Sequence, residues 1–262
     1  MKKGLVVVGL IVLLIAGGVM FLLGGAGDFI RAQIEQQGSK FLGTSVSVLN
    51  VDLALTDGRL TINDLDVENP SGFSQSDAFS FESVTLDLGN VTSEPYVVQN
   101  VSINAPEILY EFDASGQGNL LALKDNLMAQ IPTSTEQAPA ESGDGANPLV
   151  IVENVTVKDV RLKLNFENLP TGDLKIDTKA YEITLPTFNA GPIGKPNGLP
   201  ADQVGAAIAN EMLDNVIAQA KAEAKKRLED EAKRLAKEKL DEEKDKLLDK
   251  ASDKLKGLFD KN

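Results

Sequence analysis

A fifteen-residue segment of this chain occurs twice without a gap, as VQNVSINAPEILYEF at 98–112 and VENVTVKDVRLKLNF at 152–166. Within each copy the apolar residues recur at every second position along two short runs, which is the pattern of strands with one apolar and one polar face. The aligned apolar pairs are Val101 and Val155, Ile103 and Val157, Ile108 and Leu162, Tyr110 and Leu164, and Phe112 and Phe166. The repeat therefore predicts a sheet with one apolar face, and the function depends on what covers that face.

The rest of the central region, 28–200, predicts an α+β fold that is mainly β. We expect strands at 44–55, 59–69, 79–89 and 173–189, about nine in all with the repeats, and the short turns between them favour an antiparallel meander. A change in apolar phase predicts a bulge near Leu49 and Asn50. A helix should start at Asp28 and end at Gly43, with its apolar side formed by Phe29, Ile30, Ile34, Phe41 and Leu42.

Two further segments interrupt the strands. The spacing at 119–131 predicts a helix, and the Pro-, Ser- and Gly-rich stretch at 132–148 predicts a disordered surface loop. A sheet of nine strands would be about 40 Å wide, so its apolar face is larger than a soluble monomer leaves exposed. Two alternatives for what covers this face remain. The sheet folds on itself as a sandwich, or it curls into a trough whose lining holds lipid acyl chains.

The N-terminus carries 22 residues, Gly4 to Gly25, without a charge or an amide. A helix of this length spans the hydrocarbon layer, which predicts a transmembrane anchor at 1–27. A cleaved signal peptide is the alternative, although its apolar region is usually shorter. Lys2 and Lys3 place the N-terminus in the cytoplasm and the remainder outside, which in a bacterium is the periplasm. We therefore expect a single-pass protein of the inner membrane.

Composition excludes several classes of function. The net charge is −13, and residues 28–220 hold 27 acidic against 10 basic side chains, which disfavours nucleic-acid binding. The chain has no Cys, His or Trp, and without His it lacks Ser-His nucleophile systems and the usual zinc ligand sets. The carboxylate pairs Asp64 and Asp66, and Glu242 and Glu243, match no catalytic or metal-binding motif. We predict no enzymatic activity, no cofactor and no metal. The sequons at Asn90, Asn100 and Asn154 are interpreted as strand-start residues.

The segment 201–262 predicts one long charged amphipathic helix, because no Pro follows Pro200. Its apolar stripe has a mean spacing of about 3.75 residues, which disfavours a long left-handed coiled coil and suits a helix lying along a surface. A solvated spacer is the alternative. Four pairs are oriented to support an exposed helix, namely Glu223–Arg227, Glu229–Lys233, Asp230–Arg234 and Glu242–Lys246.

The order of these features resembles the AsmA-like family of Gram-negative envelope proteins. The resemblance rests on the N-terminal anchor, the helix ending at Gly43, the strand around Val46–Val48, the passage 60–73 with its NPSGF end, and the segments 100–103 and 106–108. It covers 1–112 well and 149–190 loosely, and the chain departs from larger members in its length and its charged tail. The resemblance implies an inner-membrane-anchored trough of repeating strands that moves or holds phospholipid and is linked to outer-membrane maintenance.

The favoured hypothesis is thus a membrane-anchored periplasmic protein, non-enzymatic, that binds or handles lipid. The residues predicted to line the lipid groove are Ile103, Ile108, Tyr110, Phe112, Val157, Leu162, Leu164 and Phe166. The alternative is a structural or adaptor envelope protein with a closed β-sandwich, whose C-terminal helix docks on a partner protein. The expected partners are the membrane, phospholipid and an envelope protein, with no nucleic acid.

Overall fold

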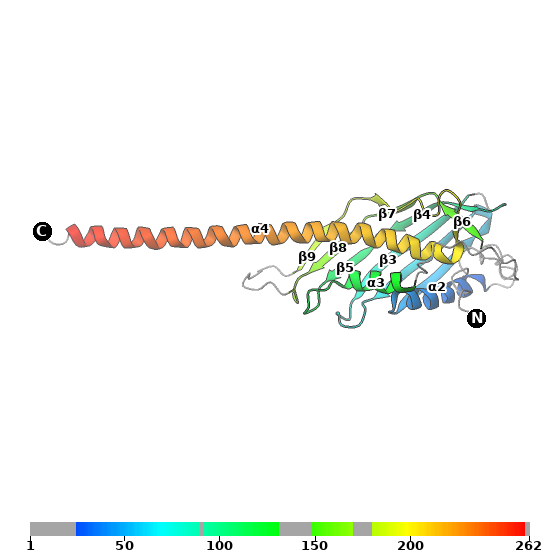
Figure 1. Ribbon diagram of the computed structural model, residues 1–262, viewed down its shortest axis with the longest axis horizontal. Coiled ribbons are helices and arrows are strands. Elements are labelled where there is room, and N and C mark those ends of the chain that lie inside the picture. The colour runs from blue at the N-terminus through cyan, green and yellow to red at the C-terminus, as the bar shows by residue number, and fades with distance from the viewer. Residues whose placement is uncertain (1–24, 90–91, 131–147, 170–179, 260–262) are drawn as a thin grey trace. The chain divides into compact units, whose positions relative to one another are not determined.

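A computed structural model describes residues 25–89, 92–130, 148–169 and 180–259 (Figure 1). These residues form an α+β fold, as predicted, with one mixed eleven-stranded sheet and three α-helices. The helices are α2 (Ala26–Leu42), α3 (Asn119–Gln130) and α4 (Ala201–Phe259), and a 3-10 turn spans Leu55–Asp57. The strands are β1 (Val46–Ala54), β2 (Arg59–Glu68), β3 (Asp77–Leu88), β4 (Tyr96–Asn104), β5 (Glu107–Glu111), β6 (Leu149–Val152), β7 (Val155–Lys158), β8 (Arg161–Asn165), β9 (Ala180–Thr184), β10 (Phe188–Asn189) and β11 (Leu199–Pro200).

Three predictions fall partly or wholly outside these residues. They are the anchor predicted at 1–27, the loop predicted at 132–148 and the strand predicted at 173–189. Among the described helices, none combines the length and the apolar character that crossing a bilayer requires.

The chain divides into two compact units, and the division lies inside α4. The first unit contains the sheet, α2, α3 and α4 as far as Ala220, and the second contains α4 from Lys221 onward. The predicted start of the long helix at residue 201 is observed, but its first twenty residues belong with the sheet.

The sheet is open and mixed, which corrects the predicted antiparallel meander and excludes the closed sandwich. β1, β2, β3 and the β4–β5 segment follow one another in antiparallel order, but β4 pairs with β6 and β7, and β5 with β8, in parallel. Residues 112–148 separate these partners and include α3. An excursion of that length returns the chain to the same end of the sheet, whereas a short turn imposes antiparallel pairing.

The parallel partners are the two copies of the sequence repeat. Val101 pairs with Val155, Ile103 with Val157, Ile108 with Leu162 and Tyr110 with Leu164, always 54 residues apart. Each residue of the first copy therefore lies beside its own equivalent in the second. The residues that align between the two copies in sequence are thus the residues that pair in the sheet.

A break in the ladder crosses the sheet at one level. Paired residues bracket it in β1, β2 and β3, between β4 and β5, and between β7 and β8. The skipped positions include Asp64, Ala105 and Asp159, whose φ angles are 46°, 44° and 55°. The apolar residues change phase at this level, as between Val48 and Val51 in β1. Because the partner strand changes phase at Asp64 opposite Leu49, the β1–β2 register gains no extra residue. The bulge predicted near Leu49 and Asn50 is therefore wrong, although the change of phase is real. The break also splits long strands into β4 and β5 and into β7 and β8, so the count exceeds nine.

Helix α2 covers the outer edge of β1. The edge amides of Val46 and Val48 donate to Ser39 Oγ (2.9 Å) and Glu35 Oε1 (3.0 Å), so side chains of α2 occupy groups that would otherwise template another strand. The approach is close, because a Cβ built on Gly27 would lie 2.5 Å from the Val51 carbonyl oxygen. The helix ends at Gly43 with φ 67°, as predicted, but it begins at Ala26 with no side-chain cap, so Asp28 is not its start.

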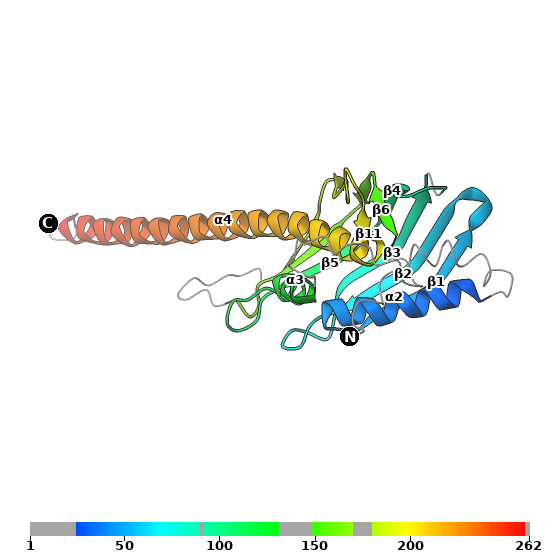
Figure 2. The ribbon, with the colours of Figure 1, turned by 45° about the vertical axis from the view of Figure 1, so that its right-hand side comes forward.

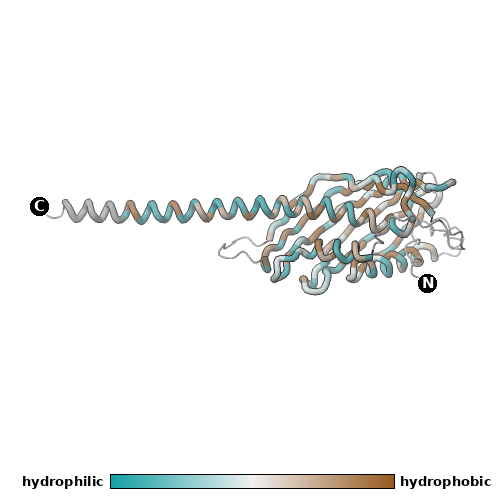
Figure 3. Tube along the Cα trace, in the orientation of Figure 1, coloured by the Kyte–Doolittle hydropathy of each residue, from teal (hydrophilic) through white to brown (hydrophobic). Residues whose placement is uncertain are grey.

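Helices α3 and the first part of α4 lie over the same face of the sheet (Figures 1 and 2). This part of α4 is buried through apolar side chains that include Val204, Met212, Leu213, Val216 and Ile217. An ion pair between Lys124 of α3 and Asp214 of α4 joins the two helices. Along the strands, apolar and polar residues alternate (Figure 3). The buried residues of the strands are the apolar ones, such as Val101, Ile103 and Ile108. The apolar face is thus covered largely by the chain's own helices.

Candidate functional site: the apolar face of the sheet

The structure brings all eight predicted groove residues together on the apolar face. Six of them form the cross-strand pairs Ile103–Val157, Ile108–Leu162 and Tyr110–Leu164. The rings of Phe112 and Phe166 stack at the end of this row, with centroids 5.9 Å apart. The sequence pattern therefore identified a real set of neighbours.

Most of these eight residues are also among the most completely covered of the described residues. Seven are at most 4% exposed, and only Phe112 is half-buried. The cover includes α3, and Gly118, the residue before this helix, lies so close that a Cβ built on it would be 2.6 Å from the Tyr110 ring. Burial raises the pKa of the Tyr110 phenol. In this structure the repeat-derived residues belong to the hydrophobic core, and their contact with lipid stays a prediction.

A less covered part of the same face lies over β1, β2 and β3. Here a buried cluster formed by Ile30, Ile34, Val48, Val51, Leu60 and Ile62 is flanked by apolar side chains that are only half-buried. We call these five the β1–β3 strip: Leu53, Leu65, Val84, Leu86 and Leu88. Register keeps them on the apolar face, because Leu53 and Leu86 each pair with buried Leu60 and Val84 pairs with buried Ile62.

The β1–β3 strip lies beside the point where the chain arrives from its apolar N-terminal segment. α2 begins at Ala26, and Gly27 contacts the backbone of Val51, two residues before Leu53. Sequence reasoning did not single out these residues. The alternation of apolar residues in these strands was visible in the sequence. It does not distinguish a leucine that a helix covers from one that lies beside the helix.

A buried polar network explains the NPSGF passage. Glu111 Oε1 accepts hydrogen bonds from Asn69 Nδ2 (2.9 Å) and from the Ser74 amide (2.8 Å). Asn119 donates to Asn69 Oδ1 (2.7 Å) and to the Leu109 carbonyl (2.8 Å), and it accepts from the Glu111 amide (3.0 Å). The network ties the end of β2 to β5 and to the first residue of α3. It positions the helix that covers the core, and sequence analysis did not identify Glu111 or Asn119.

The opposite face of the sheet is polar and holds a small open pocket. Its lining includes Asp77, Glu107 and Lys163. The hydrogen bond from Lys163, together with the nearby charges of Lys163 and Arg161, lowers the pKa of Glu107. Partial burial, followed by the carboxylates of Asp66 and Glu68, raises the pKa of Asp77. Each polar group of Glu107 therefore has a structural partner, and the pocket shows no arrangement typical of catalysis.

The two carboxylate pairs considered in the sequence lie on different elements, Asp64 and Asp66 on β2 and Glu242 and Glu243 on α4. Asp64 is exposed at the ladder break, Asp66 is half-buried and faces Ser80 of β3, and Glu242 and Glu243 are exposed on α4. Within the described ranges no three acidic side chains are placed to hold a metal ion. Of the sequon residues, Asn100 lies in β4, Asn154 lies between β6 and β7, and Asn90 falls outside the described residues.

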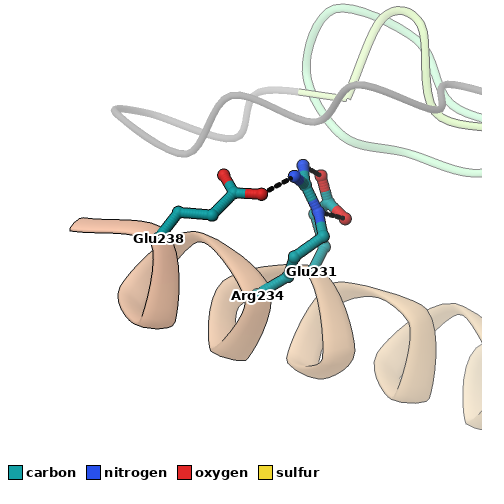
Figure 4. Close-up of polar contacts among 3 residues, drawn as sticks. All are labelled: Glu231, Arg234 and Glu238. Carbon is teal, nitrogen blue, oxygen red and sulfur yellow. Dashed lines mark hydrogen bonds and ion pairs between the residues drawn. The ribbon is translucent and has the colours of Figure 1, made fainter. Parts of the chain in front are cut away.

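The second unit of the chain is described by itself. From Lys221, α4 carries ion pairs along its surface, including the predicted Glu223–Arg227 (2.7 Å) and Glu242–Lys246 (4.0 Å) pairs. Arg234 makes a forked contact with Glu231 and a further one with Glu238 (2.6 Å), rather than the pair predicted with Asp230 (Figure 4). These contacts between residues three and four positions apart stabilise the middle of the helix.

Comparison of the chain with models of protein families, with curated proteins and with solved structures finds no match. The resemblance to the AsmA-like family therefore rests on the residues given above.

Proposed function

We propose that this protein is a membrane-anchored, non-enzymatic lipid-binding protein of AsmA-like type, in which acyl chains contact the β1–β3 strip. The carrying observation is the incomplete cover of Leu53, Val84, Leu86 and Leu88 on an otherwise buried apolar face. Aliphatic side chains left half-exposed gain about 25 cal/mol for each Å² removed from water, and an acyl chain offers that gain without any specific polar contact.

The position of the strip supports a hydrocarbon ligand over a protein one. The apolar segment Gly4–Gly25 leads directly into α2, and α2 borders the strip. A segment of that length predicts a bilayer anchor, so the strip would lie close to a source of lipid. The proposed setting is the periplasmic side of an inner membrane, as the two N-terminal lysines favour.

The absence of native Trp allows a direct test. Leu86→Trp places an indole on the strip, and Thr85→Trp places one on the polar face of the same strand, one residue away. Full-length protein carrying each variant is reconstituted in phosphatidylcholine nanodiscs with and without brominated acyl chains. Strong quenching of the indole in Leu86→Trp and weak quenching of the indole in Thr85→Trp are expected. Equal quenching in the two variants would refute lipid contact at the strip.

A second measurement addresses a bound lipid. Native mass spectrometry of the full-length protein released from detergent should show phospholipid adducts, and Leu86→Asp should reduce them. Leu162→Asp is not a suitable control, because Leu162 is fully buried and the variant would disturb the core. Thr85→Asp, which adds the same charge on the polar face, serves instead and should retain the adducts.

The adaptor alternative loses one of its two supports. Its closed sandwich does not exist, since the sheet is open and covered by helices. Its second support, a docking role for the C-terminal helix, stays a prediction.

A further inference from the structure

One polar side chain lies inside the apolar core of the first unit without a partner. Gln37 of α2 is 7% exposed, and its Oε1 atom is buried with no hydrogen-bond donor among the described residues. Gln37 shares the inward side of α2 with Ile30 and Ile34, which belong to the cluster that the β1–β3 strip flanks. A buried acceptor without a donor costs free energy, so the direct explanation is a donor that the described chain does not supply.

The contacts of α2 with β1 place Gln37 at one end of the β1–β3 strip. Helix and strand run in opposite directions, because Glu35 accepts from the Val48 amide and Ser39, one turn later, accepts from the amide two residues earlier in β1. Gln37 therefore lies at the level of Val48 or just beyond it. Leu65 of the strip pairs with Val48, so Gln37 lies beside the Leu65 end of the strip.

The strip extends from this end along β3. Leu65 pairs with Phe81, and Leu88 lies seven residues farther along the strand, which is about 23 Å at about 3.3 Å per residue. Val84 and Leu86 line the distance between them. One leaflet of a bilayer contributes about half of the roughly 30 Å hydrocarbon layer, so a single acyl chain fits along the strip. The unpaired oxygen of Gln37 lies at one end of that path.

The burial of Gln37 restricts the chemical group that reaches it. A phosphate or an ammonium group would lose its hydration beside a neutral amide, with no opposite charge there to compensate. A hydroxyl group is small and uncharged, and it donates a hydrogen bond to a carbonyl oxygen. The acceptor is therefore matched by an uncharged hydroxyl at the head of an acyl chain.

We propose that Gln37 selects the ligand of the β1–β3 strip, and that this ligand is a neutral lipid with a free hydroxyl group. The hydroxyl donates to Gln37 Oε1, and the acyl chain extends along β3 toward Leu88. This inference rests on the proposed function, because it assumes that acyl chains contact the strip. Phosphatidylcholine also contacts the strip through its acyl chains, but it has no hydrogen-bond donor for Gln37.

A competition experiment separates the two claims. Full-length Leu86→Trp is placed in nanodiscs of brominated phosphatidylcholine, where acyl contact at the strip quenches the indole. Hexadecanol or hexadecyl methyl ether is then added to the bilayer; the two molecules have the same chain, and only the alcohol carries a donor. We expect the alcohol to restore half of the lost fluorescence at a mole fraction about fivefold below that of the ether, which corresponds to one ordinary hydrogen bond.

Two further substitutions in α2 identify the acceptor. Gln37→Leu removes it, so the alcohol and the ether should then compete equally. Gln36→Leu makes the same change at the exposed neighbouring position and should retain the preference for the alcohol. Because Gln37→Leu removes an unpaired polar group from the core, it should not destabilise the fold, and near-ultraviolet circular dichroism checks this.

The outcomes distinguish this proposal from the one it rests on. Equal competition in Leu86→Trp alone, the result expected if a buried water satisfies Gln37, overturns the selection of a hydroxyl and leaves the lipid contact standing. A preference for the alcohol that survives Gln37→Leu also overturns it. Absence of quenching before any competitor is added refutes the lipid contact itself, and the selection with it.

Discussion

Removing the Asn119 side chain should destabilise the sheet unit far more than its small size suggests. Asn119 is fully buried, and its amide makes three hydrogen bonds, with the Glu111 amide, the Leu109 carbonyl and the Asn69 side chain. In Asn119→Ala these three groups lose their partner inside the protein. At about 1 kcal/mol for each bond, and more where the remaining group cannot reach water, the expected loss is about 3 kcal/mol in the free energy of unfolding.

Glu111→Gln is the matched control. The glutamine keeps an oxygen that accepts from Asn69 and from the Ser74 amide, so the geometry of the network survives. Its expected cost is below about 1 kcal/mol, near the value of one altered hydrogen bond. Both variants change a polar group in the same network, and only one of them leaves several groups unpaired.

Urea unfolding of the full-length protein in detergent micelles, followed by near-ultraviolet circular dichroism, measures the difference. All three tyrosines, Tyr96, Tyr110 and Tyr181, lie in the first unit, so this signal reports on the sheet and not on the long helix. The midpoint should fall with little change in slope. A loss below about 1 kcal/mol for Asn119→Ala, or an equal loss for Glu111→Gln, would contradict the role assigned to the network.

Three further predictions concern single contacts. Gly118→Ala should cost about 2 kcal/mol, because its Cβ would lie 2.6 Å from the Tyr110 ring, and the near-ultraviolet signal should change with it. Since the pKa of buried Tyr110 is raised, the stability linked to it is present below the ordinary value of 10.0 and is lost as the pH rises through the folded value; ultraviolet titration should show one phenol ionising after the others. The lowered pKa of Glu107 has the opposite sign, so its contribution is present above 4.5 and is lost as the pH falls through the folded value; a carboxyl NMR titration should detect this, and Lys163→Met should move the pKa upward.

The repeat shows how far the pattern of residues could lead. Alternation placed Ile103, Tyr110, Leu162 and Leu164 on one apolar face, and the structure confirms that they are neighbours. Alternation does not specify strand direction, because parallel and antiparallel partners present the same faces. The parallel pairing depends on how residues 112–148 return the chain, and that return is a property of the whole fold.

The break in the ladder could be predicted only in part from the sequence, for a similar reason. The phase change in β1 is visible between Val48 and Val51, and it predicts a bulge if the neighbouring strand is regular. The neighbour is not regular, since Asp64 opposite Leu49 has φ 46°. A feature shared by adjacent strands cannot be recognised in one of them.

The groove residues illustrate a limit that concerns function. A leucine on an apolar strand face is predicted to be covered, but the identity of the cover is not a local property. Leu162 and Leu86 have the same pattern in sequence, yet the first is fully buried and the second is half-buried. The difference arises from where α2, α3 and the start of α4 lie, which shifts the proposed lipid contact from the repeat to the β1–β3 strip.

The sequence by itself determined where the helices form and which strand residues share a face, because the spacing of apolar residues is a property of short segments. Tertiary structure alone decided that the two repeat copies pair in parallel 54 residues apart, that the sheet stays open, and that the chain's own helices fill most of its apolar face. The physical reason is that cover and register come from segments distant in sequence. Burial depends on how the helices pack on the sheet, and a short stretch of sequence does not specify which helix covers it.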